Sequence, residues 1–183
     1  MRPTTDAVPM HQEEAQPGEG PAVAVGSPLE TLVQFEAYMA GGGSLRQLFH
    51  VDPLDLEVLY AYGCKRYREG DYEGARQIYL ALVTIDPRAF DYWLALGLAM
   101  QKMQRHDEAI ACFARTAKMR LFDPRSSFFA GVSFQLQGDL EHAREAFGAA
   151  IKWCGRQQEY RELREQAEQA LQALAMTKPG EKK

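Results

Sequence analysis

The side chains with the most reactive chemistry in this chain are its histidines and cysteines, and their spacing does not form a metal site. The histidines are solitary: His11, His50, His106 and His142. No pair of histidines or cysteines has the short spacing that zinc ligands need. The cysteines are odd in number and far apart: Cys64, Cys112 and Cys154. We therefore expect no metal site and no disulfide framework, as is typical of a reducing compartment.

A nucleophilic cysteine and a phosphate-binding loop are the next possibilities. Cys64 precedes Lys65 and Arg66, and nearby cations can lower the pKa of a thiol. No histidine lies in the same stretch to act as a base, so a small packing residue is the favoured interpretation. The glycine run before Ser44 follows no strand and lacks the Gly-Lys-Ser/Thr sequence of a phosphate loop. The sequence predicts a protein that is not an enzyme and uses no cofactor.

Composition limits the remaining functions. The chain has 183 residues and a net charge of −4 at pH 7, with 46% hydrophobic and 25% charged residues. This is enough chain for one domain with a sizeable core. The acidic balance argues against direct binding of nucleic acid, which needs clustered cations. No apolar run approaches the roughly 18 to 20 residues of a membrane span, and no apolar signal segment is present near the N-terminus. We expect a cytoplasmic protein.

One period of 34 residues organises the centre of the chain. Three residue classes hold this spacing: Gly63, Gly97 and Gly131; Ala75, Ala109 and Ala143; Tyr79, Phe113 and Phe147. This is the period of tetratricopeptide repeats, in which each unit is a helix, a tight turn and a second helix. The fold class is therefore predicted to be an all-α solenoid of three such repeats, at about 56–89, 90–123 and 124–155.

Other segments flank the repeats. Residues 1–26 are rich in proline and glycine and poor in large apolar side chains, and we predict a disordered tail. Ser27 and Pro28 begin an N-terminal helical segment over 27–50, which is interrupted by the glycine run and resumes after Ser44. The repeats occupy 51–155. A half-polar capping helix is expected over 156–176, because the last repeat has no neighbour, and 177–183 form a flexible tail.

Particular glycines are predicted to have particular tasks within a repeat. Gly63 lets the two helices of the first repeat approach closely, and Gly70 can take a positive φ in the turn. Gln104 stands where the turn of the second repeat would have a glycine.

The first helices of such repeats line a concave surface. The fifth, ninth and twelfth positions of each unit face it: Tyr60, Cys64 and Tyr67; Leu94, Leu98 and Gln101; Phe128, Val132 and Gln135. Six of these nine residues are clearly apolar or aromatic. A continuous apolar groove indicates a binding site. The alternative stays open that some of them are core residues, either because the superhelix is tight or because a tail covers them.

Three longer stretches have a more specific resemblance. They are "FEAYMAGGGSLRQL", "LEVLYAYGCKRYREGDYEGARQIYLALVTIDP" and "YWLALGLAMQKMQRHDEAIACFARTAKM". Together they resemble the class II chaperones of bacterial type III secretion, which serve the hydrophobic translocators that form pores in host membranes. The resemblance covers about residues 29–175. It implies a cytosolic virulence chaperone that binds an extended hydrophobic, proline-containing translocator segment in its groove, and so prevents aggregation and premature association before secretion.

The resemblance also implies which residues bind partners. The predicted translocator-binding residues are Tyr60, Cys64, Tyr67, Tyr72, Leu94, Leu98, Gln101, Phe128 and Val132. Cys64 stands where a large aromatic residue can occur, which implies a wider pocket. Members of the family often form homodimers through the N-terminal helix, here about 29–40, whose apolar residues include Leu32, Val33, Phe35 and Met39. Some members also act with a transcription activator.

A generic tetratricopeptide adaptor is the alternative. An adaptor that holds a C-terminal carboxylate needs Lys, Arg and Asn along its groove. Here the fifth and ninth positions are apolar, and only Lys102 and Arg125 lie nearby.

Overall fold

The structure is a computed structural model of the chain and describes residues 28–176. The predicted tails at 1–26 and 177–183, and the predicted cap Ser27, lie outside the described residues. The chain divides into two compact units, Met1–Gly41 and Gly42–Lys183. This boundary falls inside the segment predicted over 27–50. In the first unit the described element is the helix α1 (Pro28–Ala40).

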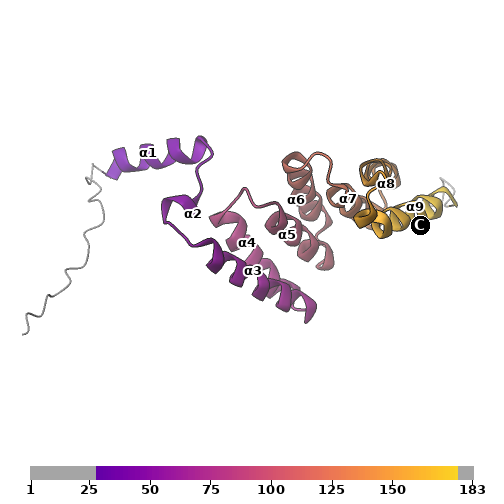
Figure 1. Cartoon of the computed structure of the whole chain (residues 1–183), viewed down its shortest axis with the longest axis horizontal. Helices are drawn as coiled ribbons and strands as arrows, with labels where there is room; N and C mark the ends of the chain where they lie inside the picture. The colour runs from indigo at the N-terminus through magenta and orange to yellow at the C-terminus, as the bar shows by residue number, and fades with distance from the viewer. Residues whose placement is uncertain (1–27, 177–183) are drawn as a thin grey trace, which may run out of the picture. The chain divides into compact units, whose positions relative to one another are not determined.

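The second unit consists of helical pairs stacked in chain order (Figure 1). A short helix, α2 (Leu45–Leu48), precedes them. The pairs are α3 (Pro53–Arg68) with α4 (Tyr72–Ile85), α5 (Phe90–Lys102) with α6 (His106–Met119), and α7 (Pro124–Gln137) with α8 (Leu140–Cys154). A 3-10 turn, η1 (Gln158–Tyr160), leads into α9 (Arg161–Met176). Residues 28–176 contain no strand, and the predicted all-α repeat fold is confirmed.

Aspartate residues cap the N-termini of two of the first helices, α3 and α7. The carboxylate of Asp52 accepts a hydrogen bond from the backbone N–H of Leu54 at 2.9 Å. The carboxylate of Asp123 does the same for Arg125 at 3.0 Å. In both helices a proline follows at the first helical position, where its missing N–H has no intrahelical partner to lose.

Within each pair, a glycine on the first helix faces an aromatic ring on the second. These contacts are Gly63 with Tyr79, Gly97 with Phe113, and Gly131 with Phe147. A Cβ atom added to these glycines would lie 2.7, 2.6 and 2.9 Å from a ring carbon, which is closer than real contacts allow. The three rings are almost fully buried. The 34-residue period therefore arises because each repeat makes the same packing contact between a glycine and an aromatic ring.

The turns inside the repeats use the left-handed region of φ. Gly70 has a φ of 84° and Gly138 a φ of 82°. Gln104 occupies the corresponding turn of the second repeat with a φ of 62°, although it has a side chain. Its Oε1 lies 3.1 Å from Nε2 of His106. The turn of the second repeat therefore has the positive φ that is typical of glycine, at a residue that carries a side chain.

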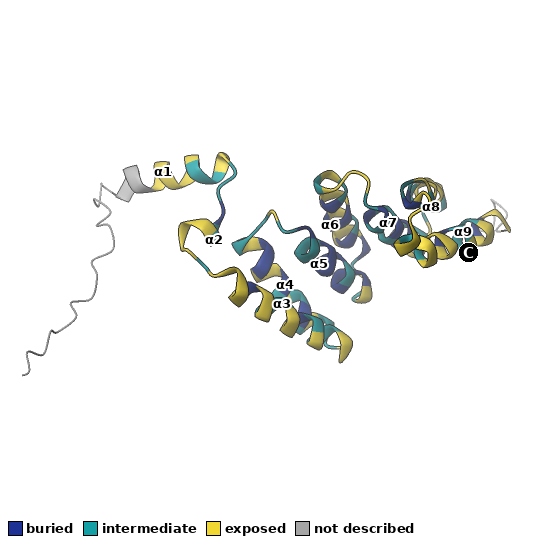
Figure 2. Ribbon diagram, viewed as in Figure 1, coloured by how far each residue is buried: buried dark blue, intermediate teal, exposed yellow. Residues whose placement is uncertain are grey.

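The capping helix differs in its start from the prediction. Gly155 has a φ of 53° and ends α8, and the 3-10 turn follows before α9 begins at Arg161. The helix thus starts five residues later than the predicted residue 156. Its inner face buries Ala167 and Leu174 beside the core formed by α7 and α8, while most of its other residues are exposed (Figure 2).

Candidate functional site

The first helices of repeats one and two enclose an apolar hollow of about 260 Å³. Its lining residues are Tyr60, Cys64, Tyr67 and Arg68 of α3, Tyr79 of α4, and Ala95 and Leu98 of α5. Residues 60, 64 and 67 lie on one face of α3 because their spacing of four and three matches the helical period. The structure thus brings four of the predicted groove residues together around one space: Tyr60, Cys64, Tyr67 and Leu98.

Tyrosine rings form most of the aromatic wall of this hollow. The ring of Tyr60 lies 5.8 Å from that of Tyr79 and 5.3 Å from that of Tyr92, measured between centroids. Tyr67 meets Tyr72 edge-on at 5.3 Å. The hydroxyl of Tyr79 donates a hydrogen bond to the sulfur of Cys64 at 3.5 Å. These contacts fix the rings before any ligand arrives, which lowers the entropy lost on binding.

The other predicted groove residues lie deeper. Leu94, Gln101 and Phe128 are buried, with 7%, 9% and 8% of their surface exposed. The amide Nε2 of Gln101 donates to the carbonyl of Phe129 at 2.9 Å and to Oγ of Ser133 at 2.7 Å. It therefore ties α5 to α7.

Phe128 packs at 5.8 Å from the ring of Phe147, and Val132 is half-buried beside the same core. The hollow does not extend to these two residues, nor to Tyr72, Leu94 or Gln101. Tyr72 reaches it only indirectly, by holding Tyr67.

Comparison with known proteins identifies the families and structures to which this chain is similar. Tetratricopeptide-repeat families match residues 56–85 and 94–161. A type III secretion complex from Aeromonas hydrophila aligns with a TM-score of 0.74 and 30% identity, covering 78% of this chain and 95% of that one. The type III secretion translocator chaperone SycD of Yersinia enterocolitica aligns with a TM-score of 0.69 and 28% identity, covering 72% and 98%. This chain belongs to the family of type III secretion translocator chaperones.

Further relatives agree with this membership. The low calcium response locus protein H of Yersinia pestis is 29% identical over 134 residues, which is 73% of this chain and 80% of that protein. SycD is also known in complex with a peptide of the translocator YopD, in a structure that aligns with a TM-score of 0.66 and 28% identity over 69% of this chain and 96% of that one. Another SycD structure shows an alternative dimer.

The electrostatics of the hollow favour an uncharged ligand. Burial raises the pKa of Tyr60 and of Tyr79 far above the usual tyrosine value, and burial together with the neighbouring Tyr72 also raises the pKa of Tyr67. The three phenols therefore stay neutral at physiological pH. The charged group in the lining is Arg68, an exposed residue whose Nε donates to the carbonyl of Cys64 at 3.2 Å. This translocator chaperone thus has an apolar hollow with neutral tyrosines and one charged lining residue, Arg68.

Three lining residues were missing from the sequence-based set: Arg68, Tyr79 and Ala95. In the sequence Tyr79 was identified only by its place in the 34-residue period. Tyr79 also faces the hollow, where it lies beside Cys64. A larger side chain at position 64 would cover the ring of Tyr79. Arg68 and Ala95 each follow a predicted groove residue in sequence, which was the available signal.

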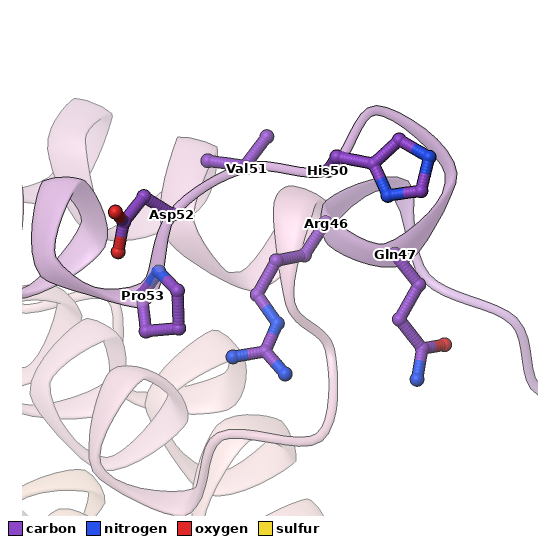
Figure 3. A pocket seen from close by; sticks show the side chains of 6 residues that line it. All are labelled: Arg46, Gln47, His50, Val51, Asp52 and Pro53. Carbon is purple, nitrogen blue, oxygen red and sulfur yellow. The ribbon is translucent and has the colours of Figure 1, made fainter. Parts of the chain in front are cut away.

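A second hollow of about 410 Å³ lies where α2 leads into α3 (Figure 3). Its lining residues are Arg46, Gln47, His50, Val51, Asp52 and Pro53. Nε of Arg46 lies 3.2 Å from the carboxylate of Asp86, so its charge already has a partner within the fold. This hollow is therefore a weaker candidate for ligand binding than the tyrosine-lined one.

The described residues also limit other chemistry. Between residues 28 and 176, no group of His, Cys, Asp and Glu is arranged to hold a metal ion. Burial raises the pKa of the Cys112 thiol to about 11 and also raises that of Cys154, so neither is a ready thiolate. No helix in the described part of the chain has the length and apolar character needed to span a bilayer.

Proposed function

We propose that this chaperone holds an extended, hydrophobic, proline-containing segment of a translocator against α3 and α5, with one bulky side chain in the hollow lined by Tyr60, Cys64, Tyr67 and Leu98. The observation that carries the proposal is the hollow itself, an apolar space between tyrosines that are already packed in place. The relative SycD, bound to a peptide of a translocator, supports it.

Binding of this kind suits a client that must later enter a membrane. Such a client exposes apolar segments that aggregate in water, and a groove covers one segment without folding it. An extended proline-rich segment has little conformational freedom to lose. Burial of one leucine side chain would contribute about 1.5 to 3 kcal/mol. We infer that the chaperone works in the bacterial cytoplasm by binding alone, without catalysis.

Substitution of Tyr67 tests the proposal. Tyr67→Ala should weaken binding of a translocator-derived peptide by about 5- to 150-fold, which corresponds to the loss of roughly 1 to 3 kcal/mol. The melting temperature should change little, because Tyr67 is only half-buried. The measurement is calorimetric titration of the peptide, with a thermal melt of each variant.

Tyr62→Ala is the matched control. Tyr62 lies on the same helix, is 48% exposed and does not line the hollow. Its removal should leave peptide affinity unchanged. Equal affinities for wild type and the Tyr67 variant would show that the peptide binds elsewhere.

We also propose that α1 mediates self-association. Leu32, Val33 and Phe35 are 50%, 63% and 40% exposed, and three large apolar side chains on one short helix favour a partner helix. Met39, the fourth predicted residue, is half-buried. Deletion of residues 1–40 should give a smaller assembly in sedimentation while the helical circular dichroism and the cooperative melt remain. Loss of the cooperative melt would place α1 in the core instead.

A further inference from the structure

The loop between α6 and α7 exposes two large apolar side chains. Figure 2 shows this loop as exposed. Leu121 is 66% and Phe122 is 67% exposed. The corresponding positions of the other repeats, 34 residues away on either side, carry Pro87 and Arg88, and Gly155 and Arg156. The repeat fold therefore does not require apolar residues here. Among the equivalent positions of the three repeats, only this loop carries two large apolar side chains, which makes it a candidate docking surface.

The aromatic part of this loop is already ordered. The ring of Phe122 lies edge-on to that of Trp153 on α8, with the centroids 4.9 Å apart. The backbone N–H of Asp123 donates to the carbonyl of Arg120 at 3.1 Å and closes the turn. On the α8 side, Nζ of Lys152 lies 4.9 Å from the centre of the Trp153 ring. A ligand that packs on this aromatic pair would not have to order it first.

Besides Lys152, cations flank the loop in the sequence, with Lys118 and Arg120 before Leu121 and Arg125 after Phe122. The guanidinium groups of Arg120 and Arg125 lie 4.2 and 4.9 Å from the centre of the Phe90 ring. Nε and Nη2 of Arg125 donate to the carboxylate of Asp123, so the N–H edge of Arg125 is already occupied. Asp91 is 3.8 Å from Arg120 and 3.6 Å from Arg125, which are long contacts.

The remaining charges near the loop also leave an excess of positive charge. Asp123 pairs with Arg125 at 2.7 Å and its side chain is only 7% exposed. Lys118 and Lys152 are exposed. Arg125 is thus paired with Asp123, whereas Lys118, Arg120 and Lys152 remain as exposed cations near the loop, in a chain whose net charge is −4.

We propose that this surface is a second protein-docking site, which binds an acidic segment carrying one leucine or aromatic residue. We call it the Phe122 surface and define it as Leu121, Phe122 and Trp153 with Lys118, Arg120 and Lys152. The apolar side chain of the segment packs on Phe122 and Trp153, and its carboxylates meet the surrounding cations. The site shares no residue with the tyrosine-lined hollow, so the two can be occupied together.

A protein segment fits this surface better than a membrane or a nucleic acid. Membrane anchoring by such a patch relies on a broad apolar face that enters the lipid, and here Phe122 lies sideways against Trp153. Nucleic acids are bound through many phosphate contacts, whereas this surface offers three exposed cations in a chain whose net charge is −4.

Selection from a phage-displayed random peptide library tests the proposal on the full chain. Phe122→Arg serves for counter-selection, because it introduces the residue that the other two repeats carry at this position. We expect peptides that bind the wild type and not the variant, with Asp or Glu around a leucine or aromatic residue. A selection that yields no such peptide, or only peptides without acidic residues, would overturn the proposal.

Titration of a selected synthetic peptide separates the contribution of the apolar contact to affinity from that of the charged contacts. Phe122→Arg adds a positive charge, so a loss of affinity of at least about tenfold would identify the apolar contact. Lys152→Glu should weaken binding about three- to tenfold and reduce its sensitivity to salt. Leu121→Ser keeps the charge and should weaken binding too, while Tyr67→Ala should leave it unchanged. A peptide whose affinity survives both loop substitutions, or a protein that binds phosphatidylglycerol vesicles through Phe122 and no acidic peptide, would contradict the assignment.

Discussion

The first and third repeats place equivalent residues in the same geometry and use them differently. Tyr60 lies 5.8 Å from Tyr79, and its counterpart Phe128 lies 5.8 Å from Phe147, both measured between ring centroids. Tyr60 nevertheless lines an open hollow, whereas Phe128 is 8% exposed and part of the core. The same position in the repeat therefore does not decide whether a residue contacts a ligand or is buried in the core.

The neighbouring side chains explain the difference. One turn after Tyr60 stands Cys64, whose small thiol leaves space beside Tyr67. One turn after Phe128 stands the larger Val132, and α9 packs beside this repeat. The first repeat thus keeps room for a ligand, while the third is filled by the chain itself.

Truncation of Phe128 should have the largest effect among the variants that probe this comparison. Phe128→Ala removes a buried ring and leaves a cavity, which should reduce the free energy of unfolding by about 3 kcal/mol or more. The measurement is urea unfolding followed by circular dichroism. Phe49→Ala is the control, because Phe49 is 68% exposed and its removal should change stability little.

The same variant decides which role Phe128 has. At a temperature where the variant stays folded, peptide affinity should equal that of the wild type. A stable variant with weakened affinity would place Phe128 in the binding groove, as the sequence alone predicted.

The sequence was sufficient for the repeat architecture because each unit repeats one physical contact. A glycine against an aromatic ring, such as Gly97 against Phe113, requires fixed spacing, and that spacing is visible as the 34-residue period. The N-caps Asp52 and Asp123 are local signals of the same kind. The 3-10 turn at Gln158–Tyr160 was missed, because it depends on how Gly155 ends α8 and on how α9 packs.

The groove could be predicted only in part. A position in the repeat tells which helix face a residue occupies, and this brought Tyr60, Cys64, Tyr67 and Leu98 to one hollow. The extent to which residues on that face are buried depends on how the next repeat packs against them. Gln101 is buried because its amide binds Phe129 and Ser133 on α7, a contact between residues 28 and 32 positions apart that no local pattern reports.

Turn substitutions should have a smaller effect and sharpen the comparison between repeats. Gly70 has a φ of 84°, so Gly70→Ala should destabilise the first repeat by about 1 kcal/mol. Gln104→Gly relieves a side chain at a φ of 62° and should stabilise the protein by about 0.5 kcal/mol, since the loss of its contact with His106 offsets part of the gain. Urea midpoints measure both. A destabilised Gln104 variant would mean that the contact with His106 outweighs the backbone strain.

The smallest effect is expected from pH, and it tests whether the hollow is as neutral as its burial indicates. The pKa values of Tyr60, Tyr67 and Tyr79 are raised, chiefly by burial, so each phenol remains protonated in the folded protein beyond the usual tyrosine pKa of about 10. Because the folded pKa lies above the unfolded one, the stability linked to these groups is complete below about pH 10 and is lost as the pH rises further. A translocator peptide without titratable side chains should therefore bind with the same affinity at about pH 6.5 and about pH 9.5, and calorimetric titration at both values measures it. A loss of affinity at the higher pH, absent in Tyr67→Phe, would show that the Tyr67 phenol ionises at the site and that the hollow is more open to water than its geometry indicates.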